Sequence, residues 1–289
     1  MPYDASLPYG VSPLTSVVFG EPNAVYHADT AHWSNSQITT FRSDGPAEFF
    51  RRHVARDTVS PSNGGMRRGT HVHLWAEIGY EAFAARLSLA PDEYTTAAGA
   101  LSARAKPWLD TLPADAIPMT RQEADGLLAQ CRAIEEEPVA RALLERVEWR
   151  EFSVRWTDDH GHMLRCRPDM ATPEVWADLK STREARPLDT WWKSARSYRY
   201  AQQAALYGLG ARQCHWPPHS LHFIVTSSVP PYRCHVVTLP ERWVQREHDA
   251  LMRTLDEIER RRSLDCWLDD EHGRVVELRV PRSVIEEDY

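Results

Sequence analysis

The sequence predicts one domain of the α/β (α+β) class, with a central mixed sheet flanked by helices and an N-terminal helical region. Helical apolar spacing dominates up to about residue 147, strand-length apolar segments begin near residue 151, and strands and helices then alternate to about residue 262. The chain of 289 residues is 42% apolar and can bury a full core. We expect a single domain over 1–289, with a mainly helical part (1–147), a sheet core (148–240) and a C-terminal helix with a tail (241–289).

The N-terminal part is expected to contain short helices. In "SNSQITTF", Ser34 and Gln37 have the spacing of a capping box that starts a helix. The turn "SDG" then leads to a second helix, "PAEFFRRHVAR", which begins at Pro46. The glycine-rich "SPSNGG" at residues 60–65 is typical of a flexible loop, and a helix is expected in "GTHVHLWAEIGYEAFAARL" directly after it.

Two more helical regions and a set of strands follow. The helical regions are "TAAGALSARAKPWLDTL" and "TRQEADGLLAQCRAIEEEPVARALLERV", each interrupted by proline. The segments "EFSVRWTD", "HMLRCRPDM" and "EVWADLK", separated by "DHG" and "ATP", predict a meander of three strands. A long helix is expected from about Leu188 to Leu209, then strands in "LHFIVTS" and "RCHVVTL". The last helix, "PERWVQREHDALMRTLDEIERRR", has one apolar stripe of Val244, Leu251, Leu255 and Ile258.

Composition and charge exclude several classes of protein. There is no run of about 18 apolar residues, and the first residues, MPYDASLPYGVSP, lack a basic start followed by an apolar stretch. We therefore expect a cytoplasmic protein without a membrane segment. The net charge of −7 argues against a surface that is basic throughout, but it allows a local basic groove. Five widely spaced cysteines without a C-x-x-C pair predict reduced thiols, and neither a zinc site nor an iron–sulfur cluster.

The third strand of the meander carries charged residues in an unusual place. Residues two apart in a strand share a face, so Asp178 and Lys180 should project together while Leu179 points into the opposite layer. Asp169, at the end of the preceding strand, can lie across the ladder from them, and Glu151 can add a third carboxylate. A D-x-K sequence alone is more often a salt bridge on a solvated strand face.

Several carboxylates beside one lysine are costly unless a cation neutralises them. Oxygen ligands favour Mg²⁺, with Mn²⁺ as a substitute, over zinc. The amine of Lys180 can then orient or help deprotonate an attacking water, and it can stabilise the charge on a phosphate under in-line attack. The acids and the lysine together indicate a site for metal-assisted phosphate hydrolysis.

Two helices are expected to flank this strand. In "GTHVH", Gly69 and His73 lie four apart on one helix face, where Gly69 allows close backbone approach and His73 offers a nitrogen ligand to the same metal. Taken alone, His73 is more often a satisfied, partly buried histidine. In "QAALY", Gln203 and Tyr207 are also one turn apart. They are suited to contact a DNA backbone or to brace the lysine, and ordinary packing of an amphipathic helix explains them equally well.

Residues 180–200 reverse the acidic balance of the chain. Only Glu184 and Asp189 oppose the cations there, and such a reversal is typical of a phosphate-binding surface. Trp191 and Trp192 can stack on bases, although a tryptophan pair more often belongs to a core. The residues that we expect to bind DNA are Arg67, Arg68, Arg183, Arg186, Lys193, Arg196, Arg199, Tyr200, Gln203 and Tyr207.

Taken in order, these motifs resemble the PD-(D/E)xK nuclease superfamily. "PD" at residues 168–169 and the D-x-K of Asp178 and Lys180 resemble its core, while "GTHVH" and "QAALY" resemble the G-x-x-x-H and Q-x-x-x-Y motifs of its RecB-like and RecE-like branches. The chain is most similar to the phage-encoded RecE-like exonucleases of the exodeoxyribonuclease VIII group. "YHADTAHWSNSQITTF" and "GPAEFF" resemble that family's N-terminal signature, and the resemblance fades past about residue 240.

The resemblance implies a PD-(D/E)xK core and a Mg²⁺-dependent exonuclease. Such an enzyme digests one strand of linear double-stranded DNA from 5′ to 3′ and leaves a 3′ overhang for a strand-annealing recombinase; its relatives form rings, so a homo-oligomer is expected. By the same resemblance His73, Asp169 and Asp178 bind metal, with the Leu179 carbonyl as an extra ligand, and Lys180 is catalytic. Glu151 serves a second metal or positions water, with Glu148 as the alternative acid. Loss of the Asp178 carboxylate should abolish cleavage and leave folding and DNA binding largely intact.

Three alternatives remain at this point. One is an endonuclease or a single-strand exonuclease, because the core motifs do not set the polarity or the kind of end. Another is a noncatalytic DNA-end-binding recombination accessory protein with the same fold, although the intact acid set and lysine speak against it. The third is a structural protein in which all four motifs coincide by chance.

Overall fold

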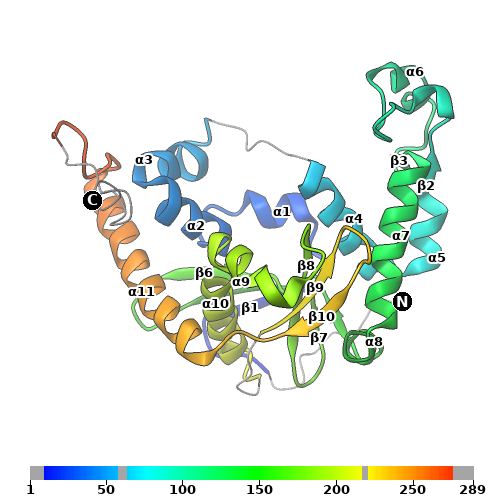
Figure 1. The fold of residues 1–289 in the computed structure, drawn as a ribbon. Coiled ribbons are helices and arrows are strands. Elements are labelled where there is room, and N and C mark those ends of the chain that lie inside the picture. The colour runs from blue at the N-terminus through cyan, green and yellow to red at the C-terminus, as the bar shows by residue number, and fades with distance from the viewer. Residues whose placement is uncertain (1–9, 58–63, 217–220, 276–289) are drawn as a thin grey trace, which may run out of the picture.

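The protein was analysed as a computed structural model that describes residues 10–57, 64–216 and 221–275. Its centre is a five-stranded sheet in the order β10-β9-β8-β7-β4 (Figure 1). Strands β8 and β9 run parallel and the other pairs run antiparallel, so the sheet is mixed, as predicted. The strands are β4 (Trp149–Arg150), β7 (Met170–Ala171), β8 (Trp176–Thr182), β9 (His222–Ser227) and β10 (Cys234–Val237).

A second, antiparallel sheet has the order β1-β5-β6, with β1 (Thr15–Val18), β5 (Ser153–Thr157) and β6 (Met163–Cys166). The prediction of one three-stranded meander is therefore wrong, because β6 and β8 belong to different sheets. One edge of β6 pairs with β5, and the other is bonded to Trp33, whose backbone donates to Met163 and accepts from Arg165. With both edges of β6 occupied, the chain turns at residues 167–169 and enters the main sheet through β7.

Short helices lead from β1 toward the main sheet: α1 (Asn23–Ala28), α2 (Asn35–Asp44), α3 (Pro46–Phe49) and a π-helical turn, η1 (Phe50–Val54). The capping box is confirmed, since the Ser34 backbone N–H donates to Gln37 Oε1 at 2.8 Å. Gly45 joins α2 to α3 at a φ of 91°, a conformation that favours glycine. The predicted loop at 60–65 lies partly outside the described residues, and Gly64 and Gly65 belong to the next helix.

The helix predicted from Gly69 onward is two helices, α4 (Gly64–Ile78) and α5 (Tyr80–Arg86). They separate at Gly79, whose φ of 81° ends the first helix and redirects the chain. Helix α4 lies against β8, and its Val72 and Trp75 are buried beside the sheet. This contact carries His73 to the sheet.

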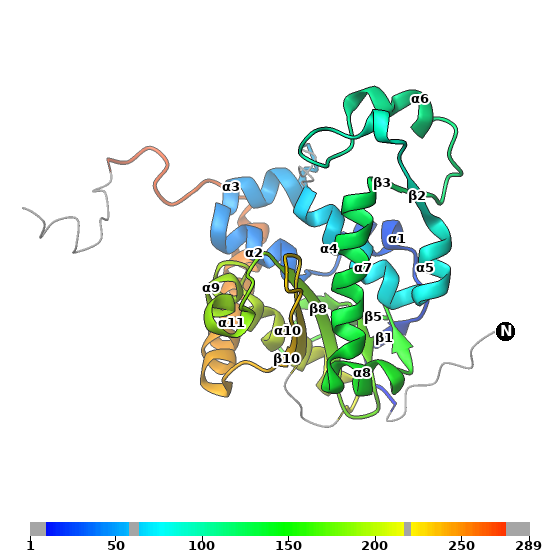
Figure 2. The ribbon, with the colours of Figure 1, turned by 45° about the vertical axis from the view of Figure 1, so that its right-hand side comes forward.

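The segment from β2 (Leu87–Leu89) to β3 (Ile117–Met119) projects from the body of the protein (Figures 1 and 2). The helix predicted in "TAAGALSARAKPWLDTL" is wrong: this stretch holds only η3 (Ala103–Ala105) and α6 (Lys106–Leu109), with η2 (Asp92–Tyr94) before it. A bridge between Thr95 and Leu101 and the φ of 78° at Gly99 form a turn instead. The projecting segment has few neighbouring elements against which an apolar helix face could pack, so packing does not stabilise a long helix there.

The next predicted helix forms α7 (Arg121–Glu136) and α8 (Pro138–Glu145), with the break at Pro138 as expected. The long helix predicted near 188–209 is also divided, into α9 (Pro187–Ser197) and α10 (Tyr200–Gln213), because Arg199 is left-handed with a φ of 54°. Helix α11 (Glu241–Leu264) packs on α10 and buries Leu251, Leu255 and Ile258, which confirms its apolar stripe.

Helices cover both faces of the main sheet. On one face α10 and α11 pack with Trp176 and Phe223, and on the other α4 and α7 pack with Leu179 and Ile224. Gly210 lets α10 approach the second sheet, since a Cβ there would lie 2.7 Å from Cys166 Sγ. All five cysteines are free, and only Cys266 is exposed. Within the described ranges, no helix combines the length and apolar character needed to cross a bilayer.

Candidate active site

Strand β8 carries the centre of the candidate site. Asp178 and Lys180 share a face and form an ion pair through Asp178 Oδ2, while Leu179 is buried in the opposite layer, as the strand periodicity predicted. The other carboxylate oxygen, Asp178 Oδ1, accepts a hydrogen bond of 3.0 Å from Gln203 Nε2 on α10. Only 2% of Asp178 is exposed, so Lys180 and Gln203, rather than water, stabilise the charged form of its carboxylate.

Lys180 is held as an ammonium. Its Nζ lies 4.7 Å from the ring centroid of Tyr200, which is itself stacked on Trp191 at 5.5 Å. Burial by itself lowers the pKa of Lys180, but the charge of Asp178, with smaller contributions from Tyr200 and Asp169, outweighs burial and raises that pKa above its ordinary value. The pairing with Asp178 thus favours the charged ammonium form of Lys180 in the metal-free protein.

Asp169 lies in the bend before β7 and faces two elements. Its Oδ2 accepts from the Leu179 backbone N–H at 2.6 Å, and its Oδ1 lies 3.3 Å from His73 Nδ1 on α4. These contacts fix the carboxylate between β8 and α4. Asp169 thus lies across the ladder from the D-x-K strand, as predicted. Because β7 is short, the bend that precedes it lies beside Leu179.

Glu151 is the third acid, and the backbone holds it in an unusual conformation. Its φ of 47° lies in the left-handed region, and its N–H donates to the Asp169 carbonyl at 3.1 Å. Arg167 Nε lies 2.9 Å from Glu151 Oε2, and the Arg167 carbonyl accepts from the Tyr207 hydroxyl at 2.9 Å. Glu148, the alternative acid, is exposed and outside this cluster.

His73, Glu151 and Asp169 form a candidate metal set. One ligand atom from each lies within 4.8 Å of the others, and the three residues line a small cavity together with Leu179. One nitrogen and two carboxylates suit a divalent cation such as Mg²⁺ or Mn²⁺. Of the side chains predicted to bind metal, His73, Glu151 and Asp169 form this set. The fourth, Asp178, is bound to Lys180 and Gln203 in the metal-free protein, and its role as a ligand stays a prediction.

The pKa values in this cluster show how strongly its charges interact. Burial lowers the pKa of His73, but the charge of Asp169 outweighs burial and raises that pKa to about 9. Burial and the nearby charge of Asp169 raise the pKa of Glu151 to about 7, and the same two causes raise that of Asp178 to about 6. Burial raises the pKa of Asp169, but His73 outweighs it, so the net direction is downward. A protonated His73 thus occupies part of the role that a cation would fill.

The residues predicted to bind DNA separate into two groups. The first group lies on α10 and contacts residues of the site: Tyr200 packs against Lys180, Gln203 donates to Asp178, and Tyr207 donates to the Arg167 carbonyl. The geometry therefore supports the alternative in which these residues hold the site residues in place. Arg68 and Arg199 are half-buried: Arg68 donates to Gln130, and Arg199 donates to α2. The side chain of Arg67 lies outside the described residues. The residues that remain exposed are Arg183, Arg186, Lys193 and Arg196.

Gly69 has no close neighbour outside its own helix. Apart from its chain neighbours and the nearby backbone of α4, no described atom lies within 4 Å of the position that a Cβ would take at Gly69, so no other described element approaches it there. His73, four residues later, does reach the acids, because Val72 and Trp75 fix the rotation of α4 against the sheet.

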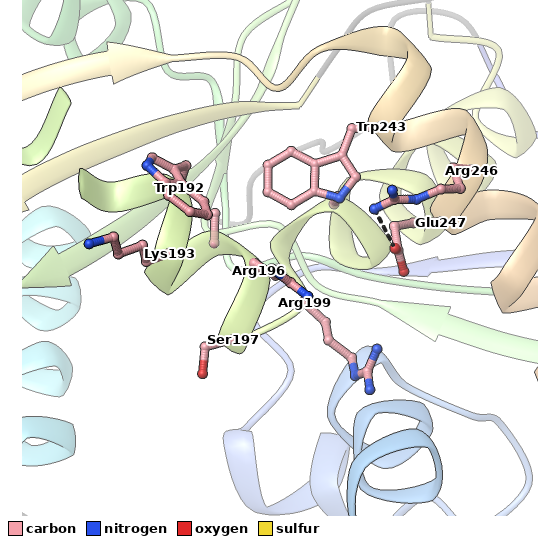
Figure 3. Close-up of a pocket in the computed structure, with 10 residues that line it drawn as sticks. Trp192, Lys193, Arg196, Ser197, Arg199, Trp243, Arg246 and Glu247 are labelled. Atoms are coloured by element: carbon pink, nitrogen blue, oxygen red, sulfur yellow. Dashed lines mark hydrogen bonds and ion pairs between the residues drawn. The ribbon is translucent and has the colours of Figure 1, made fainter. Parts of the chain in front are cut away.

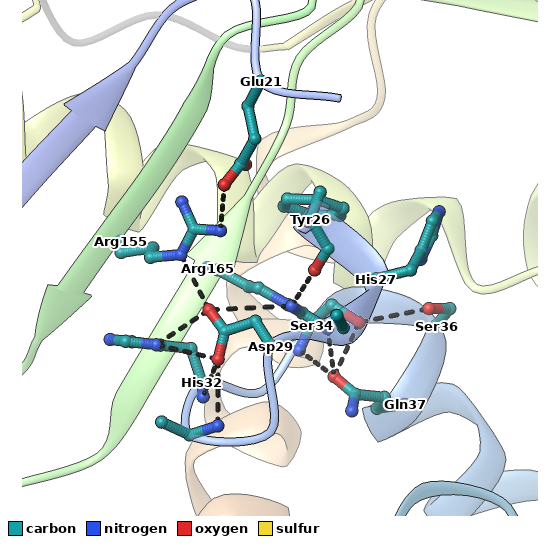
Figure 4. A network of polar contacts seen from close by, with 12 residues as sticks. Glu21, Tyr26, His27, Asp29, His32, Ser34, Ser36, Gln37, Arg155 and Arg165 are labelled. Carbon is teal, nitrogen blue, oxygen red and sulfur yellow. Dashed lines mark hydrogen bonds and ion pairs between the residues drawn. The ribbon is translucent and has the colours of Figure 1, made fainter. Parts of the chain in front are cut away.

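Sequence reasoning missed the residues that support Glu151. Arg167 lies over the ring of Tyr26 at 5.4 Å, and Tyr26 belongs to a buried polar network of the N-terminal segment (Figure 4). In that network Arg165 donates to the Tyr26 carbonyl and to Gln37, and Arg155 pairs with Asp29 at 2.7 Å. Two features of the sequence could have revealed these residues. They are Arg167, directly before "PD", and the polar stretch "YHADTAHWSNSQ". This network attaches the N-terminal segment behind the acids.

Comparisons with known proteins agree with this geometry. The crystal structure of a protein described as a "putative exonuclease" from Eubacterium rectale superposes with a TM-score of 0.58 at 15% identity, covering 94% of this chain and all of that one. At that identity the likeness shows the fold alone. No curated protein matches the sequence. A family model described as a PDDEXK-like domain of unknown function (DUF3799) matches residues 34–269. The chain therefore belongs to this PDDEXK-like family and has the fold of the PD-(D/E)xK nuclease superfamily.

Proposed function

We propose that this protein is a Mg²⁺-dependent deoxyribonuclease that hydrolyses phosphodiester bonds from the ends of linear double-stranded DNA. The observation that carries the proposal is the juxtaposition of the His73–Glu151–Asp169 set with the Lys180–Asp178 pair on β8. A structural salt bridge does not require a second cluster of acids and a histidine on its flank. The same juxtaposition provides a cation site and a fixed positive charge for a phosphate.

The residues have distinct roles in this proposal. His73, Glu151 and Asp169 hold the divalent cation, which when bound acts as a Lewis acid on the phosphate and on the attacking water. Lys180 faces the phosphate with its ammonium and stabilises the charge that develops there. Asp178 and Tyr200 hold Lys180 in place, and Gln203 holds Asp178. Arg167 orients Glu151.

The finer specificity rests on the resemblance to RecE-like exonucleases. We extend the proposal to digestion from 5′ to 3′ that leaves a 3′ overhang for a strand-annealing recombinase of phage type, by a ring-shaped homo-oligomer. The description of the Eubacterium rectale protein as an exonuclease is consistent with action at ends. Mn²⁺ should replace Mg²⁺, because both accept the same oxygen and nitrogen donors.

The test is digestion of an end-labelled linear duplex, with a covalently closed circle of the same sequence as its partner substrate. Wild type should degrade only the linear DNA in Mg²⁺, lose activity in EDTA, and release the label in the order expected for 5′ to 3′ polarity. Lys180→Ala should be inactive. Lys106→Ala, which removes an exposed lysine from the projecting α6, should retain wild-type rates.

Other outcomes identify the alternatives. Cutting of the closed circle would establish an endonuclease, and digestion of single strands alone would establish a single-strand exonuclease. End binding without cleavage in either Mg²⁺ or Mn²⁺ would identify a noncatalytic accessory protein.

A further inference from the structure

A groove of about 760 Å³ lies between α9, the start of α10 and α11, outside the candidate active site (Figure 3). Its walls carry Trp192, Lys193 and Arg196 from α9, Arg199 before α10, and Trp243 and Arg246 from α11. No role in holding the metal set or Lys180 falls to these side chains. The groove thus combines two indoles with four cations, and the sequence predicted DNA binding for three of these cations, Lys193, Arg196 and Arg199.

The two neighbouring tryptophans of α9 have different environments. Trp191 is buried and packs on Tyr200 and Phe223, so it belongs to the core. Trp192 is 52% exposed and reaches the groove. Trp243 is half-buried and lines the groove from α11, so an indole is present on each wall (Figure 3). An exposed indole offers a flat apolar face on which an unpaired base can stack.

The cations of the groove are poorly neutralised. No described carboxylate lies within ion-pair distance of Lys193 or Arg196, and Lys193 Nζ instead lies 5.8 Å from the Trp192 ring centroid. Glu247 is the one acid in the lining; it is bound at 2.9 Å by Arg42, whereas its contact with Arg246 is 3.4 Å. In a chain with a net charge of −7, this local excess of positive charge is suited to phosphates.

The groove is connected to the candidate active site through Tyr200. Arg199 and Ala201, which flank Tyr200 in sequence, line the groove, and the Tyr200 ring packs against Lys180. The start of α10 therefore contributes both to the groove and to the position of Lys180. Base pairing in a duplex hides the base faces, so the exposed Trp192 favours an unpaired strand over a double helix.

We infer that this groove binds single-stranded nucleic acid, with bases stacked on Trp192 and Trp243 and phosphates held by Lys193, Arg196 and Arg246. The inference deepens the proposed nuclease function and rests on it in one respect: the bound strand is the unpaired strand produced when one strand of a duplex end is digested. The binding itself requires no metal and no cleavage.

The test measures fluorescence anisotropy of a labelled oligothymidylate in EDTA, so that binding is separated from hydrolysis. Trp192→Ala should weaken binding by about tenfold, since stacking on one aromatic ring contributes on that order. Trp192→Phe should restore most of the loss. Leu188→Ala, which truncates a 61% exposed apolar residue on the same helix outside the groove, is the matched control and should bind like wild type.

Two further readouts separate stacking from charge. An abasic strand of equal length should bind wild type and Trp192→Ala equally, because it has no base to stack. Lys193→Ala combined with Arg196→Ala should reduce the slope of log K against log salt by roughly 1.4. Arg253→Ala, which removes an exposed arginine of α11 outside the groove lining, controls for the loss of positive charge.

Several results would overturn the inference. These are equal binding by wild type and Trp192→Ala, a Trp192→Ala penalty that persists on the abasic strand, or a preference for duplex over single strand. Binding of a labelled polyglutamate, together with no binding of the oligonucleotide, would assign the groove to an acidic protein segment instead. If duplex DNA is not cleaved but the strand binds through Trp192, the groove stands and the nuclease proposal fails; the reverse result removes only the groove.

Discussion

The candidate metal set beside β8 and the groove beside α9 differ in how their charged groups are paired. At the first, each of the ionisable groups His73, Asp169 and Glu151 faces a charged partner, and the Leu179 backbone N–H also donates to the Asp169 carboxylate. At the second, Lys193 and Arg196 extend from an exposed helix face without a described carboxylate partner. The first arrangement is pre-organised for one small cation. The second is adaptable and suits a long, flexible polyanion.

The largest expected effect concerns which acids hold the metal. Asp169→Asn and Glu151→Gln should each reduce duplex cleavage by about 10³-fold or more, because a neutral amide removes both a ligand and its charge. Glu148→Gln should leave the rate unchanged, since Glu148 is exposed and outside the set. The measurements are single-turnover cleavage in Mg²⁺ and calorimetric binding of Mn²⁺. A Glu148→Gln variant as inactive as Glu151→Gln would contradict the assignment of the third acid.

The second prediction differs from the expectation, drawn from the sequence, that loss of the Asp178 carboxylate leaves folding largely intact. Asp178→Asn should lower the free energy of unfolding by about 3–5 kcal/mol, because it leaves Lys180 largely buried without its anion. Asp178→Asn combined with Lys180→Met should recover part of that loss. Urea unfolding measures both, and Asp189→Asn, from the exposed pair with Arg186, should change stability by less than about 1 kcal/mol. Equal losses at Asp178 and Asp189 would show that burial does not matter here.

Salt should distinguish the two regions directly. Raising salt from about 50 to 200 mM should weaken binding of the oligothymidylate by about 20-fold, if three groove cations each release a counterion. Mn²⁺ binding at the partly buried His73–Glu151–Asp169 set should weaken much less, because burial reduces screening. Parallel titrations by anisotropy and calorimetry give the two slopes. Similar slopes would remove the contrast between a pre-organised and an adaptable region.

The pH dependence of Mn²⁺ binding should show whether Glu151 and His73 bind the metal. In the metal-free protein the pKa of Glu151 is raised to about 7 and that of His73 to about 9, so both groups hold protons at pH 6. A cation needs the deprotonated forms, so Mn²⁺ affinity should rise by at least about tenfold from pH 6 to pH 8. Calorimetry in buffers of different ionisation enthalpy should detect the released protons. An affinity that is flat over this range would show that neither group binds the metal.

The smallest expected effect concerns the hydrogen bond from Tyr207 to the Arg167 carbonyl, since Arg167 contacts Glu151. Tyr207→Phe removes the hydroxyl that donates to the Arg167 carbonyl and should cost about 1 kcal/mol of stability. Cleavage should fall only a few-fold, because Arg167 still reaches Glu151. Urea unfolding and the cleavage rate give the two values. A loss of cleavage as large as that of Glu151→Gln would place Tyr207 in contact with the reacting groups.

By itself the sequence determined the fold class, the D-x-K strand and the flanking helix residues His73 and Gln203. These follow from local rules: strand periodicity placed Asp178 beside Lys180, and helix periodicity gave the stripe of α11. A capping box needs only residues three apart, so Ser34 and Gln37 were also visible. The order of the motifs also indicated the PD-(D/E)xK superfamily.

Tertiary structure alone decided which groups meet. It placed Glu151 rather than Glu148 beside Asp169, through a left-handed residue and the Arg167 contact, and it gave Asp178 to Lys180 and Gln203. It also divided the meander between two sheets, because Trp33 occupies the free edge of β6. It buried Trp191 and exposed Trp192, which are adjacent in the sequence. Each of these outcomes depends on contacts between residues distant in the chain, and no local spacing encodes such contacts.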